Sequence, residues 1–166
     1  CPAQEVIRVW EVVNEEMRRV NVEVVPNKTV ILDPLNALNP ERSHMTQALP
    51  STVQIVQGTM LLGVPIGSDD FIGARLTEFL VAHQNFSDKV SRLPSAQIAF
   101  LLLKYCSVAR AIHLTRNIAP DTVGFQHYFN QVDHINIGCL SNIANAGVLS
   151  QAQIQQAQLP CRLGSM

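Results

Sequence analysis

The sequence is poor in charged residues, and this scarcity limits what the chain can be. Only 15% of its 166 residues are Asp, Glu, Lys or Arg, against about a quarter in a typical soluble domain. The formal net charge is −1, so the chain as a whole is not a basic clamp for nucleic acid. No charged residue occurs between His134 and Cys161, where Gln and Asn are frequent. Either another domain or partner covers this segment, or it is an ordinary Gln-rich solvent face.

Signatures of common active sites and of secretion are also missing. The sequence contains no Gly-rich phosphate loop, no Gly-x-Ser-x-Gly elbow and no His-Glu-x-x-His motif. Its four cysteines form no Cys-x-x-Cys pair, and no secretory signal opens the chain. We therefore expect reduced thiols in an intracellular protein, nuclear or cytoplasmic, without a membrane partner. Because the first residues already predict a helix and no Met precedes them, we expect a fragment of a longer polypeptide.

Basic residues gather in one segment that contains no acidic residue. Five of them lie between Lys89 and Pro120, namely Lys89, Arg92, Lys104, Arg110 and Arg116. A local excess of positive charge attracts phosphate groups. The same excess also suits the solvated face of a helical pair, and composition leaves both interpretations open.

Hydrophobic periodicity predicts an α+β protein in two parts, an α/β segment over residues 1–67 and a helical segment over 68–166. An amphipathic helix is expected over Pro2–Arg19, with Val6, Trp10 and Val13 on its apolar stripe. Alternating or apolar runs predict short strands, and Gln57-Gly58 predicts the turn of a hairpin. These runs are Val20–Val24, Thr29–Leu32, Val53–Val56 and Thr59–Val64. One more short helix is expected near Glu41–Ala48.

The second part reads as helices separated by prolines and caps. Ser68 is expected to cap a helix that runs to about Leu93. The next helix, Ser95–Asn117, is apolar nearly all round, which predicts a central and buried helix. A third is expected from Pro120-Asp121 to Gly147. The pattern Ser150-x-x-Gln153 predicts a capping box that opens a fourth, ending at Pro160.

Three groups of residues suggest sites, and each has a structural alternative. Adjacent carboxylates at Asp69-Asp70 suit Mg²⁺, but their place in a first helical turn favours a capping role. The set His127, His134, Cys139 and Cys161 matches no familiar zinc spacing. A third group recurs every three residues on one helix, and it forms either a phosphate-contacting ridge or a polar seam against a neighbouring lobe: Lys104, Ser107, Arg110, His113 and Arg116.

Several motifs, in order, resemble the downstream end of a reverse-transcriptase domain of the non-LTR retroelement type. Residues 21–29, Asn-Val-Glu-Val-Val-Pro-Asn-Lys-Thr, are similar to the family's Gly-Leu-x-x-Asn-Pro-x-Lys-Thr segment, with Asn21, Val22 and Val25 departing from it. Residues 61–68, Leu-Leu-Gly-Val-Pro-Ile-Gly-Ser, resemble its Leu-Gly-x-Pro-Ile-Gly-Ser motif. Weaker likenesses follow in Leu93-Pro94-x-x-Gln97, Leu101 to Cys106, Arg110 and Gln156 to Gly164.

The resemblance implies the end of a palm subdomain followed by a thumb. It implies that Leu62 and Gly63 grip the primer, and that Lys104, Arg110 and Arg116 contact an RNA/DNA primer–template. By the same resemblance Lys28 is a general acid toward the leaving pyrophosphate. The family's metal-binding aspartates would lie upstream, so Mg²⁺ is implied for the full-length parent and no cofactor for this chain. We therefore expect no catalysis by the chain alone, and its missing fingers and palm as a partner.

Two other functions remain open from the sequence. One is a helical module that binds a protein through the Gln- and Asn-rich third and fourth helices. The other is a retroelement relic without retained activity.

Overall fold

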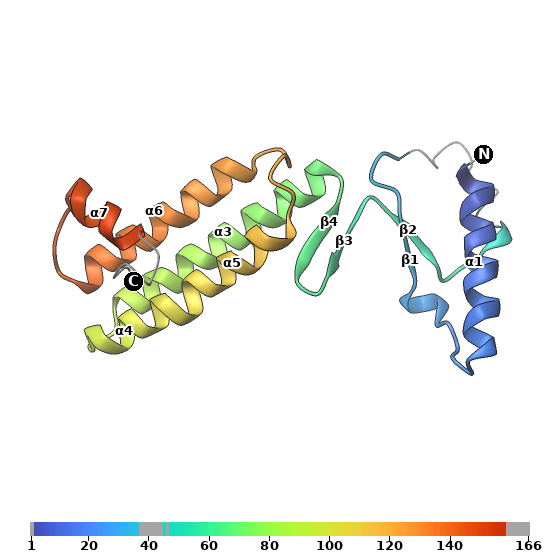
Figure 1. The fold of residues 1–166 in the computed structure, drawn as a ribbon, viewed down its shortest axis with the longest axis horizontal. Coiled ribbons are helices and arrows are strands. Elements are labelled where there is room, and N and C mark those ends of the chain that lie inside the picture. The colour runs from blue at the N-terminus through green and yellow to red at the C-terminus, as the bar shows by residue number, and fades with distance from the viewer. Residues whose placement is uncertain (1, 37–44, 46, 159–166) are drawn as a thin grey trace. The chain divides into compact units, whose positions relative to one another are not determined.

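The computed structural model describes residues 2–36, 45 and 47–158. Helices and short strands are mixed, with a helix first and a helical second half, so the predicted α+β class is confirmed (Figure 1). Contacts divide the chain into two compact units, Cys1–Ile72 and Gly73–Met166.

Helix α1 begins and ends at the residues that its periodicity predicts, Pro2–Arg19. It is terminated by Asn21, whose φ of 58° lies in the left-handed region, while the Val22 amide donates to the Met17 carbonyl at 2.8 Å. This is the helix-ending motif in which a left-handed residue lets the next amides reach back to the last turn. The strand predicted over Val20–Val24 is therefore wrong, because the start of that run completes the helix end.

The first unit holds a small parallel sheet covered by α1. A 3₁₀ turn, Pro26–Lys28, leads into β1, Val30–Leu32. Strand β1 pairs in parallel with β2, Gln54–Val56, placing Ile31 beside Ile55. Both isoleucines pack on a core cluster of α1 and the segment before β2, formed by Ala3, Met45 and Leu49 with Val6 and Trp10. Most of the helix predicted near Glu41–Ala48 lies outside the described residues.

An antiparallel hairpin follows, but its turn differs from the predicted one. Strand β3, Gly58–Leu61, pairs with β4, Val64–Gly67, so the turn is Leu62-Gly63 and not Gln57-Gly58. The apolar run before Gln57 is not an arm of this hairpin. It is strand β2, which pairs with β1. The hairpin then runs directly into helix α3, Asp69–Ser91.

The second unit is made of packed helices whose caps follow the sequence. The Ser68 hydroxyl accepts the Phe71 amide at 3.3 Å, and the Ser95 hydroxyl accepts the Ile98 amide at 3.4 Å. Helix α4, Ala96–Leu102, continues through a π-helical turn, Leu103–Ser107, into α5, Val108–Asn117. Figure 1 shows the α4–α5 rod running beside α3 and α6.

The predicted start is confirmed for helix α7 and wrong for helix α6. Helix α6, Phe125–Ile143, begins later than the predicted Pro120-Asp121. Two successive turns, closed by the Thr122 and Phe125 amides, precede it, and Gly124 just before the helix is left-handed. Helix α7, Gln151–Gln158, opens with the predicted capping box, in which the Ser150 amide donates to Gln153 Oε1 at 2.8 Å. Its predicted end at Pro160 lies outside the described residues.

The α4–α5 rod is buried on one face only, which corrects the expectation of a fully buried helix. Ala99 and Leu103 join Val90 and Cys139 in the core cluster of this unit. Ile98 and Tyr105, on the other side of the same rod, are 56% and 65% exposed. Within the described residues, the helix Ala96–Asn117 is long and apolar enough to cross a membrane, a test that core helices of soluble proteins also pass.

Candidate nucleic-acid interface

The tip of the β3–β4 hairpin is a two-residue turn with an exposed leucine. Leu62 and Gly63 have φ of 51° and 82°, as in the tight turn whose twist matches that of antiparallel strands. The Leu62 side chain is 89% exposed, while Val64, directly after the turn, is buried. The hairpin therefore presents an apolar side chain and a side-chain-free residue at its end, where another backbone can approach closely.

Two glycines fix the base of the hairpin against the start of α3. Gly58 lies opposite Gly67 in the register. A Cβ at Gly58 would meet the Phe71 ring at 2.2 Å, and one at Gly67 would meet the Gln57 carbonyl oxygen at 2.3 Å. Because the Ser68 amide also donates to the Gln57 carbonyl at 2.9 Å, the hairpin is held to the first turn of the helix that follows it.

Leu62 occupies a backbone conformation that costs a non-glycine residue about 1 kcal/mol. We expect Leu62→Gly to raise the unfolding free energy by about 0.5 kcal/mol, the strain relieved less the extra chain entropy of glycine. Leu61→Gly is the matched control, since Leu61 lies in extended β3 and its replacement should destabilise the unit. Urea denaturation followed by fluorescence of Trp10, the single tryptophan, measures both. Equal destabilisation by the two changes would contradict the turn geometry.

Lys28, the expected general acid, lies at the end of the 3₁₀ turn with its side chain exposed. Its amide donates to the Val25 carbonyl at 3.0 Å, and the Thr29 hydroxyl donates to the same carbonyl at 3.0 Å. The backbone of the turn is thus fixed while the ammonium group is solvated. Among the described residues, no hydrogen bond or ion pair joins Lys28 to the hairpin.

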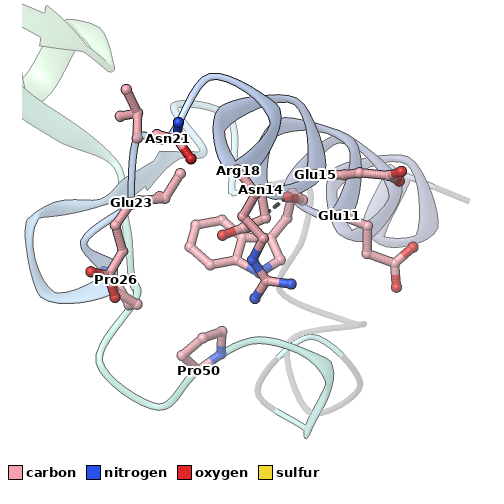
Figure 2. A pocket seen from close by; sticks show the side chains of 11 residues that line it. Glu11, Asn14, Glu15, Arg18, Asn21, Glu23, Pro26 and Pro50 are labelled. Atoms are coloured by element: carbon pink, nitrogen blue, oxygen red, sulfur yellow. Dashed lines mark hydrogen bonds between the residues drawn. The ribbon is translucent and has the colours of Figure 1, made fainter.

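A groove of about 1050 Å³ opens beside α1 in the first unit. Figure 2 shows Arg18 extending from α1 toward Pro50 across this space. The lining carries three carboxylates, Glu11, Glu15 and Glu23, against this one guanidinium. Its net negative charge repels phosphate groups, so the groove adds nothing to a nucleic-acid interface.

The three basic residues of the expected thumb surface lie on the α4–α5 rod in different settings. The Arg110 guanidinium lies 5.6 Å from the Phe79 ring centroid and 5.9 Å from that of Phe86, both on α3. The Lys104 ammonium lies 5.7 Å from the ring of exposed Tyr105, and Arg116 is exposed in the last turn of α5. Arg110 therefore borders the helix packing, whereas Lys104 lies beside the exposed apolar side of the rod.

The other candidate groups do not form metal sites among the described residues. Asp69 and Asp70 form the first turn of α3, after the Ser68 cap, as the capping interpretation predicts. His127 and His134 are exposed on α6. Cys139 is buried, and burial, with a smaller contribution from Asp88, raises the pKa of its thiol above the usual range. Cys161 lies outside the described residues.

A buried polar cluster that was not predicted from the sequence joins α3, the α4–α5 rod and α6. His83 Nε2 of α3 lies 3.0 Å from Asn136 Oδ1 of α6. The Ser107 hydroxyl, on the π-helical turn, donates to Asn136 Oδ1 at 3.0 Å and lies 3.3 Å from His83 Nε2. Since Ser107 is 0% exposed, no substrate reaches it. The cluster sets the relative register of α3, the rod and α6.

We expect this cluster to make the helical unit sensitive to acid. Burial, reinforced by the charge of Arg110 and opposed by the Asn136 hydrogen bond, lowers the pKa of His83 below 6.5. The unfolded chain therefore binds the extra proton first, so stability present above pH 6.5 is lost as the pH falls below it. We expect the thermal midpoint by far-UV circular dichroism to drop between pH 7 and pH 5.5.

Two substitutions identify the residue responsible for that drop. His83→Gln should flatten the pH dependence, because the titrating ring is gone. His134→Gln, at an exposed position of the same unit, should leave it unchanged. Identical slopes for His83→Gln and the unsubstituted chain would contradict the assignment.

Comparisons with known proteins identified no relative of this chain. A scan against protein-family models, a search of curated proteins and a search of solved structures each returned no match to the chain.

Proposed function

We propose that this chain is the palm end and thumb of a reverse-transcriptase-like polymerase, and that it holds a primer–template duplex without catalysing its extension. The observation that supports this most is the β3–β4 hairpin with its exposed Leu62-Gly63 tip, which leads directly into a helical unit. Residues 61–68, which resemble the family's Leu-Gly-x-Pro-Ile-Gly-Ser motif, contain the turn and the second strand of this hairpin.

The chemistry divides between this chain and the parent polypeptide. Phosphoryl transfer in such polymerases uses two divalent metals held by carboxylates. The described residues do not fit that role, since no group of three metal-ligating side chains occurs among them and Asp69 and Asp70 form a helical first turn. Mg²⁺ belongs to the missing upstream palm in this proposal, together with the fingers.

The residues of this chain would position the duplex. The Leu62 side chain packs against the primer terminus, and Gly63 lets the primer backbone approach. Lys104 and Arg116 contact phosphates, with Arg110 nearer the helix packing, and such contacts hold a duplex without reading its sequence. Lys28 serves the leaving group only once the upstream palm is present.

Crosslinking tests the position of the hairpin. A photoreactive phenylalanine analogue in place of Leu62 should crosslink to the 3′-terminal nucleotides of the primer in an RNA–DNA duplex. The same analogue in place of Val148, which is 97% exposed outside the hairpin, should not. Equal crosslinking at the two positions, or crosslinks spread along the duplex, would remove the main support for the proposal. Primer extension with Mg²⁺ should yield no product.

A further inference from the structure

The side chain of Arg110 is held by two aromatic rings and by no polar group. Its guanidinium carbon lies 5.6 Å from the ring centroid of Phe79 and 5.9 Å from that of Phe86, and both rings are half-buried on α3. Within residues 2–36, 45 and 47–158, Arg110 forms no ion pair and its side chain has no hydrogen-bond partner. A ring face attracts the cation without using its N–H donors.

The two rings therefore place a charge that stays available to a ligand. A guanidinium carries five N–H donors in a planar fork that matches the oxygens of a phosphate. Because Arg110 is exposed, the outer edge of this fork faces solvent. A side chain that packing has already placed loses less rotamer freedom on binding than a free one. Lys104, by contrast, lies over a single ring, that of its exposed neighbour Tyr105.

The carboxylates near the two rings in sequence are engaged by other side chains. Glu78 lies next to Phe79 and accepts from Arg75 at 2.7 Å. Asp88, two residues after Phe86, accepts from Gln84 at 2.7 Å. The rod itself, Ala96–Asn117, carries no acidic residue. No carboxylate of α3 or the rod thus neutralises Arg110 in an ion pair among the described residues.

The groups on which the Arg110 charge acts, His83 and Tyr128, offer no negative charge near neutral pH. Burial raises the pKa of Tyr128 above its usual range, against a smaller opposing effect of Arg110. Burial also lowers the pKa of His83, and Arg110 adds to that effect. Asp133, the acidic residue of α6, forms no ion pair in the part of the chain that the structure describes. Arg110 therefore keeps a positive charge without a paired anion.

We propose that Phe79 and Phe86 are positioning residues that hold the Arg110 guanidinium as the main phosphate contact of the rod. The phosphate is that of an RNA–DNA duplex backbone, so the inference rests on the proposed function. It extends that function in two ways. Helix α3 shares in binding through its aromatic side chains, and Arg110 contributes more affinity than Lys104 or Arg116.

A double-mutant cycle between Phe86 and Arg110 tests this arrangement. Phe86 is the cleaner position, because the Phe79 ring also lies 5.7 Å from that of His83 and 6.0 Å from that of Tyr128. Phe86→Leu should weaken duplex binding about threefold by fluorescence anisotropy, whereas Phe86→Tyr keeps a ring and should retain affinity. Arg110→Ala should bind about tenfold more weakly. Adding Phe86→Leu to it should cause no further loss.

Two further measurements separate orientation from packing. Arg110→Lys keeps the charge without the planar fork, so its affinity should fall between those of Arg110→Ala and the unsubstituted chain. In the unsubstituted chain, the NMR resonance of Arg110 Nε–Hε should shift when duplex is added, and that of Arg8, in the other unit, should not. Far-UV circular dichroism verifies that each variant is folded. The resonance still decides the matter if Phe86→Leu does not fold.

The possible failures are distinguishable. A chain that binds no duplex contradicts the proposed function and this inference together. Duplex binding that Arg110→Ala leaves unchanged overturns the inference alone. So does a loss from Phe86→Leu that is equal with and without Arg110, since packing of α3 is then responsible. Phosphatidylglycerol vesicles that bind through Arg110 as tightly as the duplex would assign the phosphate to a lipid headgroup, and would overturn it as well.

Discussion

Leu103→Ala is expected to lower the unfolding free energy of the helical unit by about 3 kcal/mol. Leu103 is 0% exposed and lies in the core cluster with Val90, Ala99 and Cys139. It is also the first residue of the π-helical turn, where a cavity cannot close without shifting the rod. Urea denaturation followed by far-UV circular dichroism measures the loss.

Leu101→Ala is the matched control, because it makes the same chemical change two residues away on the exposed side. We expect it to cost less than about 1 kcal/mol. Trp10 fluorescence reports on the first unit and should be unchanged in both variants. If the two alanine variants lost equal stability, the rod would be buried all round, as its composition suggests, and the one-sided packing would be wrong.

The second large effect concerns nucleic-acid affinity. We expect the double substitution Lys104→Glu with Arg116→Glu to weaken binding of an RNA–DNA duplex about 100-fold at low salt. Two phosphate contacts are then replaced by charge repulsion. Fluorescence anisotropy of a labelled duplex measures it.

One control separates this effect from a change in net charge. Arg8→Glu with Arg18→Glu makes the same charge change on α1, in the other unit, and should reduce affinity far less. Equal losses in the rod and α1 double variants would show that only net charge matters.

Local signals predicted the helices well. Pro2–Arg19 has the predicted bounds, and Ser68, Ser95 and Ser150 each cap the predicted helix. These predictions succeed because a capping hydroxyl lies within a few residues of the amide that it accepts. The left-handed conformation of Asn21 is one that asparagine adopts more readily than most non-glycine residues.

Non-local pairing could not be predicted in this way. The run Val53–Val56 looked like one arm of a hairpin, yet β2 pairs in parallel with β1 across a long intervening segment. Alternation indicates a strand but not its partner. The prediction of a fully buried rod was wrong for a similar reason, because composition does not say how many neighbours a helix has.

The polar cluster left a trace in the sequence that could have been used. His83 continues the stripe of Leu76, Leu80 and Val90 on α3, and Asn136 lies between Val132 and Cys139 on that of α6. Polar residues at core positions of two helices predict each other as partners, since a buried polar group needs one. Their link through Ser107 depends on the π-helical turn, which no local pattern indicates.

The salt dependence of duplex binding by the unsubstituted chain tests the central claim most directly. If the rod contacts phosphates through Lys104, Arg110 and Arg116, log K should fall with log salt at a slope of about −2 to −3. Fluorescence anisotropy of a labelled RNA–DNA duplex between roughly 50 and 300 mM KCl gives this slope. Absence of binding at low salt, or an affinity that does not change with salt, would contradict the account.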